Sequence, residues 1–253
     1  FSHPEWLCKR WEKRFGRVDM EALLTWNNEP APVILRLNPL APDPLDPERE
    51  ENLTGLRLDD YYQLVGRLPC EWIESGKVYV QDPSTRIAIE LLAPKPGETI
   101  LDACAAPGGK SSHIAAAMNN EGHLLCSDAN EKRIPRLLEN LTGQHVDIAA
   151  TAEFDWTCAP PHEWRSRFDR ILLDVTCSNS GVLRRRVDAR WRLKPERLQE
   201  LPSVQRLILR NALPCLKEGG RLVYSTCSLE TEENEDLILS LIHISEPTRQ
   251  EAI

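Results

Sequence analysis

The stretch between residues 99 and 118 carries the strongest structural signal: Thr99-Ile-Leu-Asp-Ala-Cys-Ala-Ala-Pro-Gly-Gly-Lys-Ser-Ser-His-Ile-Ala-Ala-Ala-Met118. Its apolar start predicts a strand over residues 99–104, and its end predicts a helix over residues 111–118. Small residues let a backbone approach a ligand closely, and the first turn of a helix offers unpaired N–H groups. The stretch therefore predicts a cofactor-binding loop between strand and helix. A plain glycine turn is the alternative.

Two common phosphate-binding motifs do not fit this loop. A P-loop needs glycine where Cys104 stands, and the dinucleotide pattern G-x-G-x-x-G is absent. Asp128 instead ends a second predicted strand, residues 123–128, where an acid in this topology hydrogen-bonds the two hydroxyls of a ribose. We therefore predict an adenosine-containing cofactor. Asp155, after the third strand, is expected to reach the adenine amino group, or else is an ordinary loop aspartate.

From about residue 76 onward, apolar strands alternate with helical segments, which is typical of a parallel sheet with covering helices. The further strands are expected at residues 147–151, 170–175 and 221–226, and the further helices at residues 131–141, 203–216 and 230–241. Pro202 is expected as a first-turn proline, and Gly219-Gly220 as a stop before the last strand. We predict an α/β, Rossmann-like fold.

Three parts of the chain are expected. For residues 1–75 we predict a small α+β subdomain, a candidate for RNA contact, with a helical start, a strand at residues 33–37 and a proline-rich connection at residues 39–47. Residues 76–240 form the catalytic domain. Residues 241–253 read as a non-native or frame-shifted tail, because a polar run replaces the strands that should complete the sheet.

Composition points to a soluble cytoplasmic protein. The 253 residues contain no apolar run of the roughly 20 residues that span a bilayer, and the start does not resemble a signal peptide. The eight cysteines include no C-x-x-C pair, so we expect reduced thiols and no metal. We expect a monomer without membrane contact.

The net charge of −8 opposes broad attraction to polyanions, so any nucleic-acid contact requires a local basic patch. Residues 184–197 supply a candidate, rich in arginine and poor in acids. A solvated surface stretch is the alternative reading. The patch residues are Arg184, Arg185, Arg186, Arg190, Arg192, Lys194 and Arg197.

Two cysteines follow two of the predicted strands. Cys177 lies in Asp174-Val-Thr-Cys-Ser-Asn-Ser-Gly181, and Cys227 lies in Tyr224-Ser-Thr-Cys-Ser228. Either alone would more often be a buried packing residue. In such sheets ligands bind beyond the carboxyl ends of the strands, so the two together predict a catalytic pair.

On these motifs the sequence resembles the Fmu/Sun group of bacterial ribosomal RNA cytosine methyltransferases, over roughly residues 1–240. Further marks are Gln81-Asp82-Pro83-Ser84, Val182-Leu183-Arg184-Arg185 and Glu232-Glu233-Asn234. The resemblance implies a class I methyltransferase sheet with helices on both faces and S-adenosylmethionine as the cofactor. The residues implied to hold that cofactor or the adjacent base are Cys104, Ala105, Ala106, Pro107, Gly108, Gly109, Lys110, Asp128, Asp155 and Asp174.

The resemblance also implies the chemistry, which is methylation of carbon 5 of a cytosine in ribosomal RNA. Carbon 5 is too weak a nucleophile by itself, so a thiolate, implied to be Cys227, first adds to carbon 6. Cys177 would help to release the product, and Asp174 would hold the ring nitrogen and amino group of the base. A helix expected from Glu230 would favour the Cys227 thiolate, whereas Glu230, Glu232 and Glu233 would oppose it.

Three alternatives remain open. Cys177 is the nucleophile if the chain follows the related DNA cytosine enzymes. The chain is a non-catalytic RNA-binding or ribosome-assembly protein if it keeps the fold without turnover. The residues leave ribosomal and transfer RNA both open as substrates, and the resemblance favours small-subunit ribosomal RNA.

The sequence also departs from the family pattern. Thr176 stands where the family usually has proline, and the helical RNA-binding domain that commonly comes first is missing. The closing strands of the sheet are missing as well. We therefore expect a fragment with truncated C-terminal strands.

Overall fold

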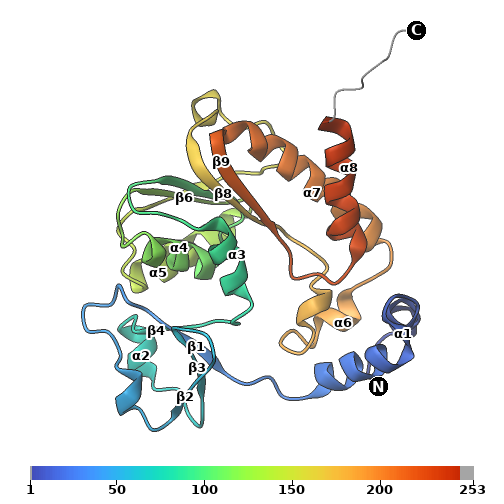
Figure 1. The fold of residues 1–253 in the computed structure, drawn as a ribbon, viewed down its shortest axis with the longest axis horizontal. Helices are drawn as coiled ribbons and strands as arrows, with labels where there is room; N and C mark the ends of the chain where they lie inside the picture. The colour runs from blue at the N-terminus through green and yellow to red at the C-terminus, as the bar shows by residue number, and fades with distance from the viewer. Residues whose placement is uncertain (1, 246–253) are drawn as a thin grey trace. The chain divides into compact units, whose positions relative to one another are not determined.

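The computed structural model describes residues 2–245 (Figure 1). The chain forms two compact units that do not follow the sequence linearly. The "sheet unit" comprises residues 32–175 and 207–225, and the "cysteine unit" comprises residues 2–31, 176–206 and 226–245 of the described chain. The division at residue 75 stays a prediction.

The sheet unit contains a five-stranded parallel sheet in the order β7-β6-β5-β8-β9. Its strands are β5 (Thr99–Asp102), β6 (His123–Asp128), β7 (Ala149–Glu153), β8 (Phe168–Asp174) and β9 (Leu216–Ser225). Parallel strands end at one edge, so Asp102, Asp128 and Asp174 all lie at the carboxyl edge. The predicted α/β fold is confirmed.

One detail of β9 differs from prediction. Gly219 and Gly220 lie inside the strand and do not stop the chain before it. Gly219 has a φ of 74°, and the β8–β9 register shifts between Phe168 and Arg170. The glycines therefore allow an irregularity that lets the strand begin at Leu216.

Helices α3 (Thr85–Leu92), α4 (Gly109–Ala117) and α5 (Ile134–Gly143) pack beside the sheet (Figure 1). A 3-10 turn, η2 (Glu131–Arg133), precedes α5. The core joins side chains such as Leu92, Ile114 and Leu137 to Ile100 and Leu172 of the strands. Burying such side chains is worth about 1.5–3 kcal/mol each.

A second, antiparallel sheet also belongs to the sheet unit, in the order β2-β3-β1-β4. Its strands are β1 (Ile34–Leu37), β2 (Leu53–Gly55), β3 (Tyr61–Leu64) and β4 (Val78–Val80), and the connections between them include η1 (Pro47–Arg49) and α2 (Cys70–Glu74). Arg36 of β1 donates to Ser112 Oγ of α4 at 2.7 Å. The expected α+β subdomain is thereby confirmed and is tied to the larger sheet.

Helix α7 (Arg197–Ala212) contains Pro202 in its interior, so the prediction of a first-turn proline is wrong. The missing proline N–H leaves the Leu198 carbonyl without its usual intrahelical donor. The extra turns bury Leu198 and Leu201, which offsets that cost. Residues 197–206 of α7 belong to the cysteine unit, and the rest of the helix belongs to the sheet unit together with the 3-10 turns η3 (His162–Trp164) and η5 (Leu213–Cys215).

The cysteine unit is mainly helical. It contains α1 (Glu5–Asn28), η4 (Ser180–Val182), α6 (Ala189–Arg192), η6 (Thr231–Glu233) and α8 (Glu235–Ser245). Gly16 interrupts α1 with a φ of 80°. Leu7, Trp11 and Leu24 of α1 pack with Leu183 and Leu193.

The predicted tail, residues 241–253, falls partly on α8, which continues through Ser245. Its remainder, residues 246–253, lies outside the described residues. Within the described part of the chain, no helix combines the length and apolar character needed to cross a bilayer.

Candidate active site

The predicted cofactor loop follows β5 as expected, but α4 begins at Gly109, so Gly109 and Lys110 lie in the first turn of the helix. Gly108 has a φ of 106°, a conformation that favours glycine. A Cβ on Gly109 would lie 2.7 Å from Cε1 of Tyr79. Gly109 is therefore required for packing against Tyr79 of β4, a contact that could not be predicted from the sequence.

Asp128 is buried at the end of β6. Its Oδ1 accepts the N–H of Asn130 at 3.0 Å, and its Oδ2 accepts the N–H of Ala106 at 3.3 Å. Arg133 lies 3.0 Å from the same Oδ2. The structure thus joins the acid to the cofactor loop through Ala106.

Asp102 stands at the start of the loop sequence, but the sequence analysis gave its side chain no role. Its side chain is buried, and Oδ2 accepts a hydrogen bond from Ser111 Oγ at 2.7 Å. Oδ1 has no hydrogen-bond partner in the described part of the chain. Burial is the main cause that raises the pKa of Asp102 to about 7. Its position at the end of β5, directly before the loop, was the available signal.

Asp174 and Lys110 come together at the carboxyl edge. Lys110 Nζ lies 2.6 Å from Asp174 Oδ2, and Ser225 Oγ donates to Asp174 Oδ1 at 2.6 Å. Two adjacent strands and the loop therefore fix one carboxylate. Ser225 is a second residue that the sequence analysis missed.

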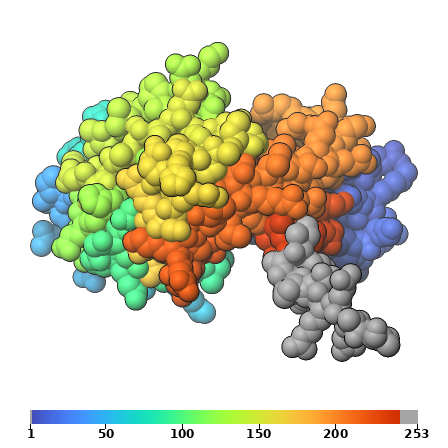
Figure 2. All heavy atoms as spheres, turned by 90° about the horizontal axis from the view of Figure 1, so that it is seen from above, coloured from blue at the N-terminus to red at the C-terminus, as the bar shows by residue number. Residues whose placement is uncertain are grey.

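Two other predicted cofactor residues have local roles in the structure. Asp155 is exposed, and its Oδ1 accepts the N–H of Thr157 at 2.9 Å and the Thr157 hydroxyl at 2.8 Å. Burial, and then the nearby Asp102, raise the pKa of the Cys104 thiol, which keeps it neutral. The segment after Asp155 includes exposed residues 162–163 and 165–167, and its yellow surface is visible in Figure 2.

Within the cysteine unit, the structure brings Cys177 and Cys227 together, with their Sγ atoms 3.0 Å apart. This separation is longer than a disulfide bond of about 2.05 Å. The N–H of Cys227 donates to Cys177 Sγ at 3.3 Å, and Cys227 Sγ donates to Asn179 Oδ1 at 3.3 Å. Residues 50 positions apart in sequence thus form one dithiol site.

The two thiols differ in environment. The side chain of Cys177 is buried, whereas Cys227 is only partly buried. The hydrogen bond with Cys227, and then burial, raise the pKa of Cys177. Cys177 therefore holds its proton strongly while Cys227 is its neighbour.

Close approach of the two cysteine loops depends on Gly181. Its N–H donates to the Cys227 carbonyl at 2.9 Å. A Cβ at this position would lie 2.9 Å from the same oxygen. Any larger side chain would push the loops apart.

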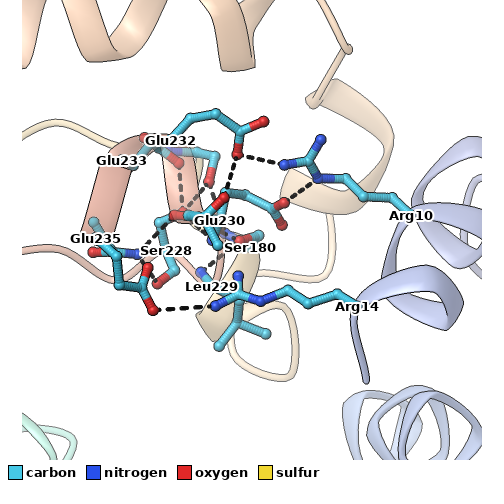
Figure 3. A network of polar contacts seen from close by, with 12 residues as sticks. Arg10, Arg14, Ser180, Ser228, Leu229, Glu230, Glu232, Glu233 and Glu235 are labelled. Atoms are coloured by element: carbon cyan, nitrogen blue, oxygen red, sulfur yellow. Dashed lines mark hydrogen bonds and ion pairs between the residues drawn. The ribbon is translucent and has the colours of Figure 1, made fainter. Parts of the chain in front are cut away.

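The helix expected from Glu230 is only a 3-10 turn there, η6 (Thr231–Glu233), and the regular helix α8 begins at Glu235, so the predicted helix dipole beside Cys227 is not formed as expected. Glu230 is fully buried, and its carboxylate accepts from Trp11 Nε1 at 3.0 Å and from Arg10. Figure 3 shows Arg10 reaching both Glu230 and Glu232. The Arg10 charge therefore opposes that of the two glutamates.

The basic segment is only partly a surface patch, and the assignment of Arg190 to RNA binding needs correction. Arg190 is buried, and its guanidinium donates to Ser2 O at 2.9 Å, Asn28 Oδ1 at 2.7 Å and Asn27 O at 2.9 Å. Its burial follows from these contacts with the ends of α1, which the sequence could not show. Arg190 thus stabilises the unit.

Arg184 is also engaged. Its guanidinium lies 3.8 Å from the centroid of the Trp26 ring and donates to Pro30 O at 2.7 Å. Arg185 and Arg186 are exposed. RNA contact by the segment stays a prediction.

A metal site was not expected from the sequence. Among residues 2–245, no three His, Cys, Asp or Glu side chains gather in a way that could hold a metal ion.

A parallel α/β sheet with a glycine loop and acids at its carboxyl edge is typical of Rossmann-like proteins that bind nucleoside cofactors, and a pair of adjacent thiols is typical of cysteine chemistry. Comparison with known proteins narrows this class. A model of the 16S rRNA methyltransferase RsmB/F family matches residues 89–251, and a model of the ferredoxin-like domain of RsmF/B-like methyltransferases matches residues 3–46. The chain belongs to the RsmB/F family.

Relatives agree with this assignment. The probable ribosomal RNA small subunit methyltransferase B of Bacillus subtilis (strain 168) is 35% identical over 249 residues, covering 95% of this chain and 56% of the relative. The ribosomal RNA small subunit methyltransferase B of Proteus mirabilis (strain HI4320) is 36% identical over 258 residues, covering 96% and 59%. The chain therefore spans little more than half the length of these relatives.

Solved structures share the fold. PH0851 superposes with a TM-score of 0.89 at 30% identity, covering 97% of this chain and 57% of that one. NSun6 from Pyrococcus horikoshii with SFG gives a TM-score of 0.83 at 20% identity, covering 95% and 87%. The second likeness concerns the fold alone. The family predicted from the sequence is confirmed.

Proposed function

We propose that the chain, as a cytoplasmic monomer in rRNA processing, transfers a methyl group from S-adenosylmethionine to carbon 5 of a cytosine in small-subunit ribosomal RNA. Cys227 is the nucleophile and Cys177 assists release. The observation that carries the proposal is the 3.0 Å separation of the two sulfur atoms. A reaction that uses one thiol to form a covalent adduct and a second to resolve it needs such a pair.

The sheet unit has features that fit the cofactor. The loop residues 104–110 offer backbone groups at the start of α4, and Asp128 is available to ribose hydroxyls once Arg133, whose side chain is 46% exposed, turns aside. The buried Oδ1 of Asp102 lacks a partner in the described residues and suits the cationic amino group of the cofactor's methionine part. When bound, S-adenosylmethionine supplies an electrophilic methyl group.

The residues of this chain supply the remaining chemistry. The Cys227 thiolate adds to carbon 6 of the base, which moves electron density to carbon 5. Asp174, fixed by Lys110 and Ser225, orients the ring nitrogen and amino group of the cytosine. After methylation, a base removes the carbon 5 proton and the Cys227 sulfur leaves. The target base must leave its stack, which favours single-stranded loops.

The environment of the thiols favours Cys227 over Cys177 as nucleophile. Cys177 is buried and has a raised pKa, so it is a poor source of thiolate in the resting enzyme. Cys227 is more exposed. The exposed Arg185 and Arg186 are proposed to contact RNA phosphates.

The test uses purified protein, labelled S-adenosylmethionine and unmodified small-subunit ribosomal RNA. We expect 5-methylcytosine in the RNA, no product and no adduct with Cys227→Ala, and a covalent RNA adduct on a denaturing gel with Cys177→Ala. The reverse pattern would make Cys177 the nucleophile. If calorimetry detects no cofactor binding, a non-catalytic RNA-binding protein is favoured. If only transfer RNA is methylated, transfer RNA and not ribosomal RNA is the substrate.

A further inference from the structure

Glu233 is a buried acid that the proposed mechanism does not use. Its side chain is fully buried. Oε1 accepts the N–H of Ser178 at 2.9 Å and the amide of Gln205 at 2.9 Å. Oε2 accepts the hydroxyl of Ser228 (Figure 3).

Two of these partners stand next to the two cysteines in the sequence. Ser178 directly follows Cys177, and Ser228 directly follows Cys227. The hydroxyls of the two serines also lie 2.9 Å apart. Because Ser228 gives its proton to Glu233, Ser178 is the donor in that second bond. One carboxylate thus links the residues that follow both sulfur-bearing positions.

Neighbouring bonds extend the link on each side. Gln205 also donates to the carbonyl of Thr176 at 3.0 Å, on the other side of Cys177. The N–H of Glu230 donates to Ser228 Oγ at 3.0 Å. The backbone on both sides of Cys177, and the backbone after Cys227, is therefore held through groups bound to Glu233.

Burying a carboxylate is costly, and hydrogen bonds from its partners offset that cost without a large net gain in stability. Stability alone is therefore a weak reason for this group. A geometric reason is stronger, because misplacing a reacting group by about 1 Å can cost on the order of 100-fold in rate.

We infer that Glu233 is a positioning residue that sets the separation of Cys177 and Cys227 by binding the residue after each. The inference rests on the proposed function, because the separation matters for turnover only if both thiols take part. The reach of the side chain, and not its charge, is the property that acts.

Two substitutions separate reach from charge. Glu233→Gln keeps the length and an acceptor oxygen, and the hydroxyl of Ser228 can turn to accept from the new amide. Glu233→Asp keeps the charge but is shorter by one methylene, about 1.5 Å, so it cannot bind both loops. Glu232→Asp is the matched control, because the neighbouring carboxylate binds Arg10 and neither cysteine loop.

The first measurement is the rate at which diamide oxidises Cys177 and Cys227 to a disulfide, followed by peptide mass spectrometry on the full chain. Diamide takes up the two hydrogen atoms that the thiols lose. We expect Glu233→Gln to react within about 3-fold of wild type and Glu233→Asp to react at least about 10-fold more slowly. Glu232→Asp should match wild type. The second measurement is kcat against KM with RNA, where Glu233→Asp should lower kcat and leave KM for S-adenosylmethionine unchanged.

Several results would overturn the inference. If the dithiol of Glu233→Asp oxidises at the wild-type rate, the reach of the side chain is irrelevant. If only Glu233→Gln slows the oxidation, the charge of the side chain is the property that acts. A lowered melting temperature with an unchanged oxidation rate per folded molecule would leave only a structural role. If Glu233→Asp does not fold, Ser228→Ala is used instead. An oxidation rate equal to that of wild type in Ser228→Ala would likewise overturn the inference. A wild type that oxidises quickly but makes no 5-methylcytosine would refute the proposed function without touching the role of Glu233.

Discussion

Replacing Asp102 with asparagine should remove a pH dependence of stability. The folded protein raises the pKa of this buried carboxyl from 3.8 to about 7, mainly through desolvation. One pKa unit corresponds to about 1.4 kcal/mol, so the difference of roughly three units corresponds to about 4 kcal/mol. That is a large part of the roughly 5–15 kcal/mol that stabilises a typical domain.

The sign follows from proton binding. Between about pH 4 and pH 7 the folded state keeps the Asp102 proton while the unfolded state has lost it. The contribution is therefore fully present below about pH 4 and is lost as the pH rises through about 7. The asparagine side chain of the Asp102→Asn variant does not titrate, and its amide still pairs with Ser111.

Urea unfolding at pH 4.5, 6 and 7.5 measures this effect. The free energy of unfolding of wild type should fall relative to that of Asp102→Asn as the pH rises, by a few kcal/mol across the range. Parallel curves for the two proteins would refute the reasoning, because they would show that burial does not raise the pKa of this group.

Three further outcomes are expected. Gly181→Ala should lower kcat by about 10-fold or more in single-turnover assays, because its Cβ would meet the Cys227 carbonyl at 2.9 Å; wild-type kcat would contradict this. Oxidation of the dithiol should abolish RNA adducts on a denaturing gel, and a reductant should restore them, since the Cys177 and Cys227 sulfurs lie 3.0 Å apart. Adducts that do not return after reduction would show that the loss has a cause other than this disulfide. Arg190→Met should lower the melting temperature, because each buried carbonyl left unpaired costs roughly 1–3 kcal/mol, but it should not weaken RNA binding per folded molecule. Arg185→Ala should weaken RNA binding and reduce the salt dependence of that binding. If the two variants lose RNA affinity equally, Arg190 contacts RNA after all.

Much of the fold could be predicted because it depends on local patterns. The strand at residues 123–128 matches β6 in both bounds, since an apolar run ended by Asp128 leaves little freedom. Pro202 misled because tertiary burial outweighed a local preference. Gly219 and Gly220 misled because a pairing irregularity inside β9 depends on its neighbour β8.

The site was predictable where strand ends meet and unpredictable where side chains bond across the chain. Cys177 and Cys227 could be paired because each follows a strand. The roles of Arg190 and Glu233 could not be predicted, because their partners lie 162 and 55 residues away. A charge in a basic or acidic run looks the same in sequence whether it is solvated or buried.

The coupling between the two thiols gives the proposed reaction an order. The hydrogen bond with Cys227 is the first cause of the raised pKa of Cys177. When Cys227 bonds to carbon 6 it becomes a thioether, so that cause is removed and Cys177 loses its proton more readily. Cys177 is then able to act as a base after the adduct has formed and not before.

Removing the Cys227 thiol should therefore mimic the adduct. We expect Cys177 in the Cys227→Ala variant to react with iodoacetamide at pH 8 about 10-fold or more faster than in wild type, because the thiolate is the reacting form. Mass spectrometry of the peptide that contains Cys177 measures the rate, and Cys215, a buried thiol whose pKa burial raises to about 11, is the internal control. Equal rates in the two proteins would mean that burial alone holds the proton on Cys177, and the order of the two thiols would then need another cause.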